Sequence, residues 1–94
     1  MGMSIIIFTL NGCEHCSNLM NELTKLNIKF IEIEISQNKE IWDSVVSQTG
    51  HNVLPSIFIR NDENDTGPVY VPGRDFESQE QIVEIIKLLR FSEN

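Results

Sequence analysis

Apolar residues recur along the chain with two different periods, and these periods predict alternating strands and helices. Residues 4–9 (SIIIFT) form a β-branched run that ends near the turn sequence Asn11-Gly12, which predicts a buried strand. Residues 30–35 alternate, with isoleucines on one face and glutamates on the other. This alternation predicts a second strand with at least one edge exposed to solvent.

A pair of β-rich segments follows in the second half of the chain. Residues 56–60 (SIFIR) and 69–71 (VYV) predict a third and a fourth strand. The stretch between them, 61–67 (NDENDTG), contains no side chain suited to a hydrophobic core. We therefore expect residues 61–67 to form the loop of a β-hairpin.

Segments with helical spacing separate and follow these strands. Residues 14–27 and 41–49 carry apolar side chains at helical intervals, and Gly50 is typical of the end of a helix. The sequence Ser-Gln-Glu-Gln at 78–81 is a capping box. It predicts that a further helix begins there and continues through the apolar residues of 82–89.

The predicted order of elements is β-α-β-α-β-β-α. A strand–helix–strand start implies a parallel pair joined by a right-handed crossover, and the later hairpin adds antiparallel strands. The chain has 94 residues with 40% hydrophobic content, and no linker, repeat or low-complexity segment interrupts it. This size is sufficient for one hydrophobic core. We expect residues 1–94 to form a single α/β domain.

The balance of charge excludes two classes of partner. Seven basic residues against fourteen acidic ones give a formal net charge of -7, and the basic residues form no cluster. Because phosphate neutralisation dominates nucleic-acid affinity, we expect no nucleic-acid binding, and the same reasoning disfavours anionic membrane surfaces. The longest apolar run, 5–8, is too short to span a bilayer, and no basic residue precedes Lys25 as a secretory signal would require. We therefore expect a cytoplasmic protein that binds no membrane.

The two cysteines of the chain lie three positions apart, in TLNGCEHC at 9–16. The predicted elements place Cys13 in the turn after the first strand, at the N-terminus of the first helix. Unpaired backbone N–H groups and the helix dipole stabilise a thiolate there, which makes Cys13 the better nucleophile. Cys16 lies one helical turn later, where its sulfur can reach that of Cys13. In an intracellular chain such a Cys-x-x-Cys pair near a β-α-β pattern indicates redox chemistry, with Cys13 attacking and Cys16 resolving.

Other uses of the cysteine pair stay open at this point. The two thiols can be inert members of the core. A structural zinc site needs two further ligands, for which the chain offers only His15 and His51, and these lack the paired spacing of such sites. We expect no metal site.

Three segments stand in order along the chain: a strand–Cys-x-x-Cys–helix segment, TGHNVLPSIFI at 49–59, and VPGRD at 71–75. This combination resembles the glutaredoxins of the thioredoxin-like superfamily, and the resemblance extends from Ser4 to about Leu89. It implies a thioredoxin-like (glutaredoxin-type) α/β fold, with a four-stranded mixed sheet that carries helices on both faces. It also implies a thiol–disulfide oxidoreductase that reduces protein disulfides or glutathione mixed disulfides.

The resemblance implies where glutathione is held. Val53, Leu54 and Pro55 match a segment that places a cis proline beside the redox cysteines, and the backbone of Leu54 would pair with the cysteinyl part of glutathione. Glu14 and His15, between the cysteines, would form part of the same groove. A protonated imidazole at His15 would also stabilise the attacking thiolate, whereas Glu14 opposes this with like charge. Alternatively, His15 is only a wall of the groove.

A second matching segment is the turn before the last predicted helix. Gly73, Arg74 and Asp75 occupy the place of a turn that binds the γ-glutamyl carboxylate of glutathione, and the backbone N–H groups of Arg74 and Asp75 would receive it. The chain departs from the family pattern here, because Pro72 stands where a first glycine is expected. It also has Leu10 in place of a common Lys or Arg before the first cysteine. These departures bear on glutathione affinity and not on thiol–disulfide exchange.

The resemblance further implies that the protein has no bound cofactor and uses glutathione as co-substrate. It implies disulfide-containing proteins such as ribonucleotide reductase as partners, and we expect a monomer. Other functions stay open. Two copies of the chain could share an iron–sulfur cluster through Cys13 and glutathione, or the chain could be a redox-idle adaptor. An absorbance band after anaerobic reconstitution would support the cluster, and slow alkylation of Cys13 would support the adaptor.

Overall fold

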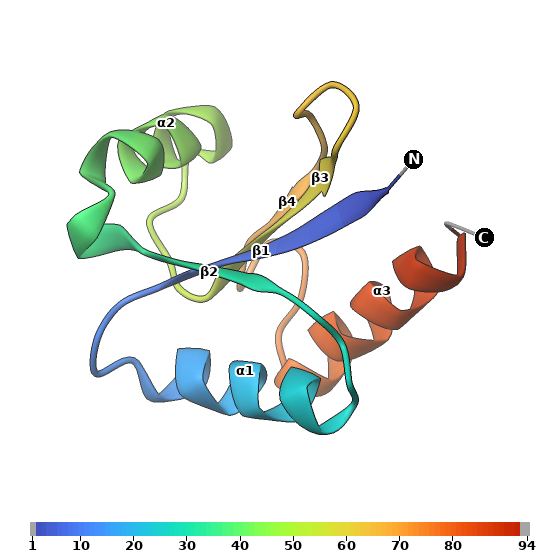
Figure 1. Ribbon diagram of the computed structural model, residues 1–94. Helices are drawn as coiled ribbons and strands as arrows, with labels where there is room; N and C mark the ends of the chain where they lie inside the picture. The colour runs from blue at the N-terminus through green and yellow to red at the C-terminus, as the bar shows by residue number, and fades with distance from the viewer. Residues whose placement is uncertain (1, 93–94) are drawn as a thin grey trace.

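The strands and helices follow the order expected from the periodicity (Figure 1). The computed structural model describes residues 2–92. Its elements are β1 (Met3–Thr9), α1 (Glu14–Lys25), β2 (Ile31–Glu34), the 3₁₀ helix η1 (Ile35–Gln37), α2 (Lys39–Thr49), β3 (Ser56–Asn61), β4 (Val69–Tyr70) and α3 (Gln79–Ser92). The predicted order β-α-β-α-β-β-α is confirmed, and η1 is an addition that the apolar pattern does not indicate.

β1 lies inside a four-stranded mixed sheet ordered β2-β1-β3-β4. β2 runs parallel to β1, as expected for a crossover through α1, whereas β3 runs antiparallel to both β1 and β4. Ile6 pairs with Ile31 on one side and with Phe58 on the other. Figure 1 shows α1 and α3 on one face of the sheet and α2 on the other. The predicted parallel pair, antiparallel hairpin and two covered faces are therefore confirmed.

Alternate residues of β1 enter two hydrophobic cores. Ile5 and Ile7 belong to the larger core, which α1 and α3 cover, and Ile6 and Phe8 belong to the smaller core, which α2 covers. In the smaller core the ring centroids of Phe8 and Trp42 lie 5.5 Å apart. Each fully buried aliphatic or aromatic side chain contributes roughly 1.5–3 kcal/mol to the stability of the fold. The packing of β1 on both faces therefore fixes the start of the cysteine loop that follows it. The buried residues of the larger core are Ile5, Ile7, Leu19, Leu23, Ile28, Ile57, Ile59, Phe76, Ile82, Val83 and Ile86.

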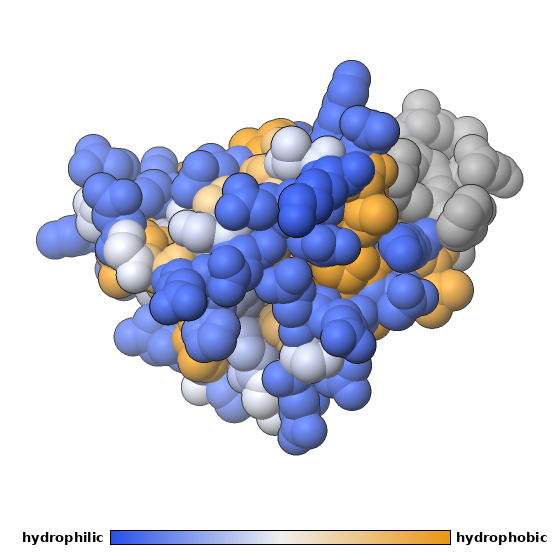
Figure 2. All heavy atoms as spheres, turned by 90° about the horizontal axis from the view of Figure 1, so that it is seen from below, coloured by the Kyte–Doolittle hydropathy of each residue, from blue (hydrophilic) through white to orange (hydrophobic). Residues whose placement is uncertain are grey.

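The outer face of α1 and α3 is mainly polar. Figure 2 shows this side of the molecule as largely hydrophilic, with apolar side chains visible between the polar ones. Both helices therefore present one apolar stripe to the sheet and a polar stripe to solvent, which is the arrangement that their helical spacing predicts.

The second strand is shorter than the alternation predicts. β2 ends at Glu34, and Ile35 begins η1. Ile33 and Ile35 pack against the smaller core, but Ile31 is 46% exposed. The reason is that β2 is an edge strand with a hydrogen-bonded neighbour on one side only. The predicted solvent-exposed edge is thus confirmed, while the apolar face is only partly buried.

The start of α3 uses the predicted capping residues in a modified form. α3 begins at Gln79, and the Gln81 N–H donates to Ser78 Oγ at 3.2 Å, as a capping box requires. The reciprocal bond is displaced by one residue, because Gln81 Oε1 accepts from the Glu77 N–H at 2.6 Å. The backbone at Glu77 is therefore tied to the first turn of α3.

The polar segment between β3 and β4 forms the predicted hairpin loop. Its ends are joined by the Asn61 N–H, which donates to Thr66 O at 2.7 Å, and by the Ile59 N–H, which donates to Pro68 O at 3.0 Å. The chain returns so close to β3 that a Cβ on Gly67 would overlap the carbonyl oxygen of Ile59. Only glycine fits this approach.

Candidate redox site

The two cysteines are joined in a disulfide at the N-terminus of α1. Cys13 is the N-cap of the helix, and the Cα atoms of Cys13 and Cys16 lie 5.3 Å apart. The Cys16 N–H donates to Cys13 Sγ at 3.2 Å. Cys13 is partly exposed, whereas Cys16 is only 1% exposed. The predicted placement, with one accessible and one shielded sulfur, is confirmed.

The turn before Cys13 is anchored to the end of β2. The Cys13 N–H donates to Leu10 O at 2.9 Å, and the Asn11 N–H donates to Glu34 Oε2 at 3.0 Å. Hydrogen bonds, first from the Ser36 side chain and then from the Asn11 backbone, lower the pKa of Glu34 and keep it ionised. The apolar pattern does not single out Glu34. The parallel register of β1 and β2, which brings the ends of the two strands together, is the signal that indicates it.

The loop between α2 and β3 brings a proline to the site. The Leu54-Pro55 peptide bond is cis, as the resemblance predicts, and Pro55 is buried. Upstream in the same loop, Asn52 Oδ1 accepts a hydrogen bond from Trp42 Nε1 at 3.0 Å. The loop is therefore tied to α2 by one side-chain hydrogen bond.

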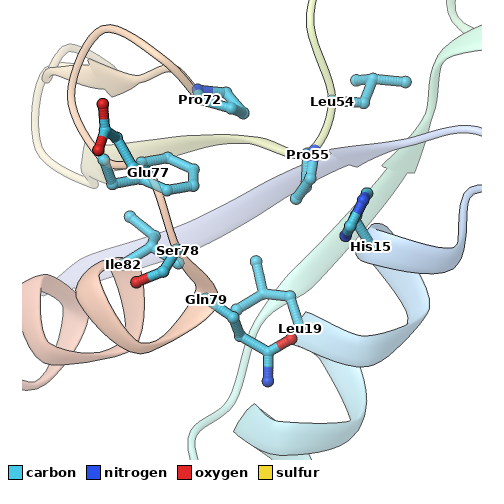
Figure 3. A pocket seen from close by; sticks show the side chains of 10 residues that line it. His15, Leu19, Leu54, Pro55, Pro72, Glu77, Ser78, Gln79 and Ile82 are labelled. Carbon is cyan, nitrogen blue, oxygen red and sulfur yellow. The ribbon is translucent and has the colours of Figure 1, made fainter.

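A cavity of about 180 Å³ lies between α1, the proline loop and the start of α3 (Figure 3). His15 comes from the first turn of α1, two residues after Cys13, and Pro55 comes from the loop before β3. Figure 3 shows both rings directed toward this space. The cavity is lined by His15, Leu19, Leu54, Pro55, Pro72, Phe76, Glu77, Ser78, Gln79 and Ile82.

The turn at 71–75 does not present the free N–H groups that the resemblance predicts. The backbone N–H groups of Arg74 and Asp75 both donate to Val71 O, at 3.2 and 2.9 Å respectively. The Val71 N–H in turn donates to Asp75 Oδ2 at 2.7 Å, and Arg74 Nη2 lies 2.8 Å from the same oxygen. Desolvation acts to raise the pKa of Asp75, but the hydrogen bonds from Arg74 and Val71 outweigh it and lower that pKa. The turn satisfies its own donors, so a carboxylate arriving at Arg74 and Asp75 would have to compete with Val71 O for these N–H groups.

The structure brings only some of the predicted contact residues to the cavity. Three of them line it: His15, Leu54 and Pro55. Five lie outside its lining: Glu14, Val53, Gly73, Arg74 and Asp75. The remaining residues of the wall were not expected at the site from the sequence; they are Leu19, Pro72, Phe76, Glu77, Ser78, Gln79 and Ile82. The capping box locates the start of α3, but local spacing does not show that this start faces α1.

A sequence model of the glutaredoxin family matches residues 5–63, which include both cysteines and Pro55. The chain belongs to the glutaredoxin family. It is 37% identical over 60 residues to glutaredoxin 1 of Rickettsia typhi, and this match covers 62% of the chain and 58% of that protein. The chain therefore spans little more than half the length of this relative. The turn at 71–75 lies beyond the residues that the family model matches.

Two solved structures share the fold. Buckwheat glutaredoxin, solved in complex with glutathione, is 23% identical with a TM-score of 0.54, over 61% of this chain and 55% of that one. Thioredoxin 1 of the thermophilic eubacterium Thermosipho africanus is 19% identical with a TM-score of 0.56, over 97% of this chain and 99% of that one. At these identities the likeness concerns the fold alone, which is thioredoxin-like, as predicted.

Two kinds of feature are absent from the described residues. None of the helices among residues 2–92 has the length and hydropathy that a membrane span requires. Over the same part of the chain, no three or more His, Cys, Asp or Glu side chains are grouped so that they could hold a metal ion.

Proposed function

We propose that the chain is a thiol–disulfide oxidoreductase that reduces protein disulfides or glutathione mixed disulfides through Cys13 and Cys16. The observation that carries this proposal is the disulfide between a partly exposed Cys13 at the N-terminus of α1 and a buried Cys16 one turn later. Accessible disulfides are the labile and catalytic ones, whereas structural disulfides resist reduction. Membership of the glutaredoxin family supports the same chemistry.

The reaction starts from the reduced dithiol. The Cys13 thiolate attacks one sulfur of a substrate disulfide R–S–S–R′; a Cys13–S–S–R bond forms, the substrate S–S bond breaks, and R′–S⁻ leaves and takes up a proton. Cys16 then loses its proton to solvent and attacks Cys13 Sγ, which releases R–S⁻ and closes the Cys13–Cys16 disulfide. Two electrons have passed from the protein to the substrate. The disulfide of the structure corresponds to the oxidised product.

The fold assists both sulfurs in this reaction. The Cys16 N–H that donates to Cys13 Sγ at 3.2 Å would donate more strongly to a thiolate, and the N-terminus of α1 favours negative charge at the same place. Burial of Cys16 keeps its sulfur away from external disulfides, so that it meets only the mixed disulfide on Cys13. The accessible sulfur therefore attacks and the buried sulfur resolves.

We infer that glutathione is the co-substrate, with two glutathione molecules reducing the Cys13–Cys16 disulfide and leaving as one molecule of oxidised glutathione, so that no bound cofactor is needed. Membership of the glutaredoxin family and the buckwheat neighbour solved with glutathione support this inference. The proposed partners are proteins that contain a disulfide, and ribonucleotide reductase is one candidate. We propose that residues 1–94 form a single domain and that the protein is a monomer. The cytoplasm is the proposed compartment, because dithiols are kept reduced there.

The test is thiol release from two substrates: the mixed disulfide of glutathione with 2-mercaptoethanol, and a peptide disulfide. We expect both to be reduced faster than in the absence of protein when glutathione regenerates the dithiol, and we expect alkylation of Cys13 to stop the reaction. If neither substrate reacts faster than the uncatalysed control, the proposal is wrong.

His15→Tyr is expected to make the disulfide harder to reduce. His15 is exposed, lines the cavity and follows Cys13 closely along the chain. A protonated imidazole there would favour the thiolate and hence the reduced form, whereas tyrosine keeps a ring that cannot carry a positive charge. We expect a smaller thiolate fraction at neutral pH and a reduction potential more negative by roughly 10–30 mV. Ultraviolet thiolate absorbance against pH and equilibration with glutathione buffers measure the two quantities.

Glu14→Gln is the matched control for His15→Tyr, because it removes the opposing negative charge. It should increase the thiolate fraction at neutral pH and make the reduction potential less negative. If His15→Tyr leaves the thiolate fraction and the potential unchanged, His15 is only a wall of the cavity.

Trp42→Phe is expected to weaken substrate binding without slowing the chemical step. The substitution keeps an aromatic ring against Phe8 but removes the N–H that holds Asn52. One neutral hydrogen bond corresponds to roughly a 2- to 10-fold change in an equilibrium, so we expect the KM for a peptide disulfide to rise by that factor while kcat stays within about twofold. Asn52→Ala removes the same bond from the exposed side and should give the same increase. An unchanged KM in Asn52→Ala would show that the bond does not position the loop.

A further inference from the structure

The cavity that His15 and Pro55 line is suited to an apolar side chain, although neither cysteine is among its lining residues. Six of the ten residues that line it are apolar: Leu19, Leu54, Pro55, Pro72, Phe76 and Ile82. Its volume is about 180 Å³. Because an apolar cavity of about 150 Å³ holds a benzene-sized group, this one can accept a side chain of the size of leucine or phenylalanine. His15, whose ring faces the cavity in Figure 3, links it to the Cys-x-x-Cys segment.

The same cavity offers an anionic ligand no permanently cationic side chain. None of its lining residues is a lysine or an arginine, and Glu77 adds a carboxylate to the wall. Figure 3 shows Glu77 on the same side of the cavity as Pro72. Two further apolar side chains lie near the site in the chain, since Leu10 in the turn before Cys13 is 42% exposed and Val53 in the proline loop is 39% exposed. Apart from His15, Ser78 and Gln79, the surroundings are therefore apolar or acidic.

The neighbouring turn already contains a bound carboxylate, that of Asp75. Asp75 Oδ2 accepts from the Val71 N–H at 2.7 Å and from Arg74 Nε at 2.9 Å. Arg74 Nη2 also donates to Val69 O at 2.7 Å, so the guanidinium is held within the turn. A carboxylate arriving from outside would have to displace Asp75 from these donors. The turn is thus closed to an anion.

These features separate the two substrate classes of the proposed reaction. Glutathione carries two carboxylates, and each needs donors or a cation in exchange for its water. An internal segment of a polypeptide has no such terminal carboxylates, and it can place an apolar side chain in the cavity. Differences of this kind in an apolar pocket alter rates by roughly 10- to 200-fold.

Resting on the proposed disulfide exchange, we propose that the site selects polypeptide disulfides with an apolar side chain beside the reactive cysteine and no acidic neighbour, in preference to glutathione mixed disulfides. The apolar side chain enters the cavity while the substrate sulfur meets Cys13. The exchange is the one given above, in which one S–S bond forms for each that breaks. Glutathione acts afterwards on the oxidised protein and needs no dedicated carboxylate site for that step.

The experiment is a single-turnover reaction of the pre-reduced protein, which requires no regenerating thiol. The substrates are 2-pyridyl mixed disulfides of end-capped peptides and of glutathione, all of which release the same neutral thione. The peptides carry leucine, alanine or glutamate before or after cysteine, and each rate is divided by that of the same substrate with dithiothreitol. Of the two leucine peptides, we expect the faster one to have a normalised rate at least about tenfold above those of the glutamate peptides and of the glutathione substrate. The alanine peptides should have intermediate rates.

A normalised glutathione rate equal to or above that of the leucine peptides would overturn this inference and leave the proposed function intact. A protein that reacts with none of the substrates above the rate of a simple thiol would instead overturn the proposed function itself. The two failures are therefore distinguishable.

Two variants that each replace a glutamate by lysine, one in the cavity wall and one far from it in the sequence, test whether the preference arises in the cavity. Glu77→Lys should raise the glutathione rate at least about fivefold, since it supplies a cation at the wall, and Glu77→Gln should give an intermediate gain. Glu63→Lys makes the same change of net charge in the exposed hairpin loop, outside the cavity lining, and should change the rate less than about twofold. Equal effects of Glu77→Lys and Glu63→Lys would show a preference set by net charge alone and would overturn the local assignment.

Discussion

Cys13→Ser is expected to abolish disulfide reduction, with a loss of roughly 10³-fold or more, whereas Cys16→Ser should retain part of the activity toward glutathione mixed disulfides. Cys13 is the accessible sulfur at the N-terminus of α1, and a serine hydroxyl at this place cannot replace a thiolate as nucleophile. Without Cys13 no mixed disulfide forms. Without Cys16 the mixed disulfide forms, and an external glutathione thiol can resolve it.

The two variants also differ in which substrates they affect. A protein whose substrate disulfide is intramolecular needs Cys16 to free the mixed disulfide quickly, so Cys16→Ser should lose far more activity toward such a protein than toward a glutathione mixed disulfide. Rates on both substrates, together with mass spectrometry of the trapped mixed disulfide, measure this. Circular dichroism of Cys16→Ser is the control, because Cys16 is buried. Activity in Cys13→Ser with none in Cys16→Ser would mean that the roles are reversed.

Gly67→Ala is expected to destabilise the fold more than any other single methyl addition at a described glycine. The new Cβ would overlap the Ile59 carbonyl oxygen and lie 3.0 Å from its carbon. β3 cannot retreat, because Ile59 pairs with Ile5 of β1 on its other side. Overpacking of this kind costs about 3 kcal/mol. In a domain of this size each kcal/mol lowers Tm by about 4–8 °C, so we expect a fall of roughly 12–24 °C.

Gly50→Ala is the matched control for Gly67→Ala. Gly50 has φ 74°, which an alanine adopts at a cost of about 1 kcal/mol, but no atom lies within 4 Å of the added Cβ. Thermal unfolding of the oxidised proteins compares the two variants with the parent. A Tm for Gly67→Ala no lower than that of Gly50→Ala would show that the hairpin relaxes at little cost, contrary to the close approach described here.

The sequence by itself determined the features that depend on neighbours along the chain. The apolar spacing of 4–9 and 14–27 predicted β1 and α1, and their junction predicted Cys13 at the N-terminus of that helix. These predictions succeeded because strand and helix periods are local properties that a single sequence carries. The cis bond before Pro55 came from the resemblance to a family, not from spacing.

Only the tertiary structure decided which polar groups at the site are free. The resemblance places a carboxylate site at the turn 71–75, yet Asp75 and Val71 use the donors of that turn internally. Likewise, Glu34 and Asn11 are 23 residues apart in the chain, and Glu34 reaches Asn11 only because β2 pairs with β1. A backbone N–H is present at every residue except proline, so its presence in the sequence says nothing about its partner. That partner is determined when distant segments pack, which is why the substrate preference that we propose for this site rests on the fold and not on the motif.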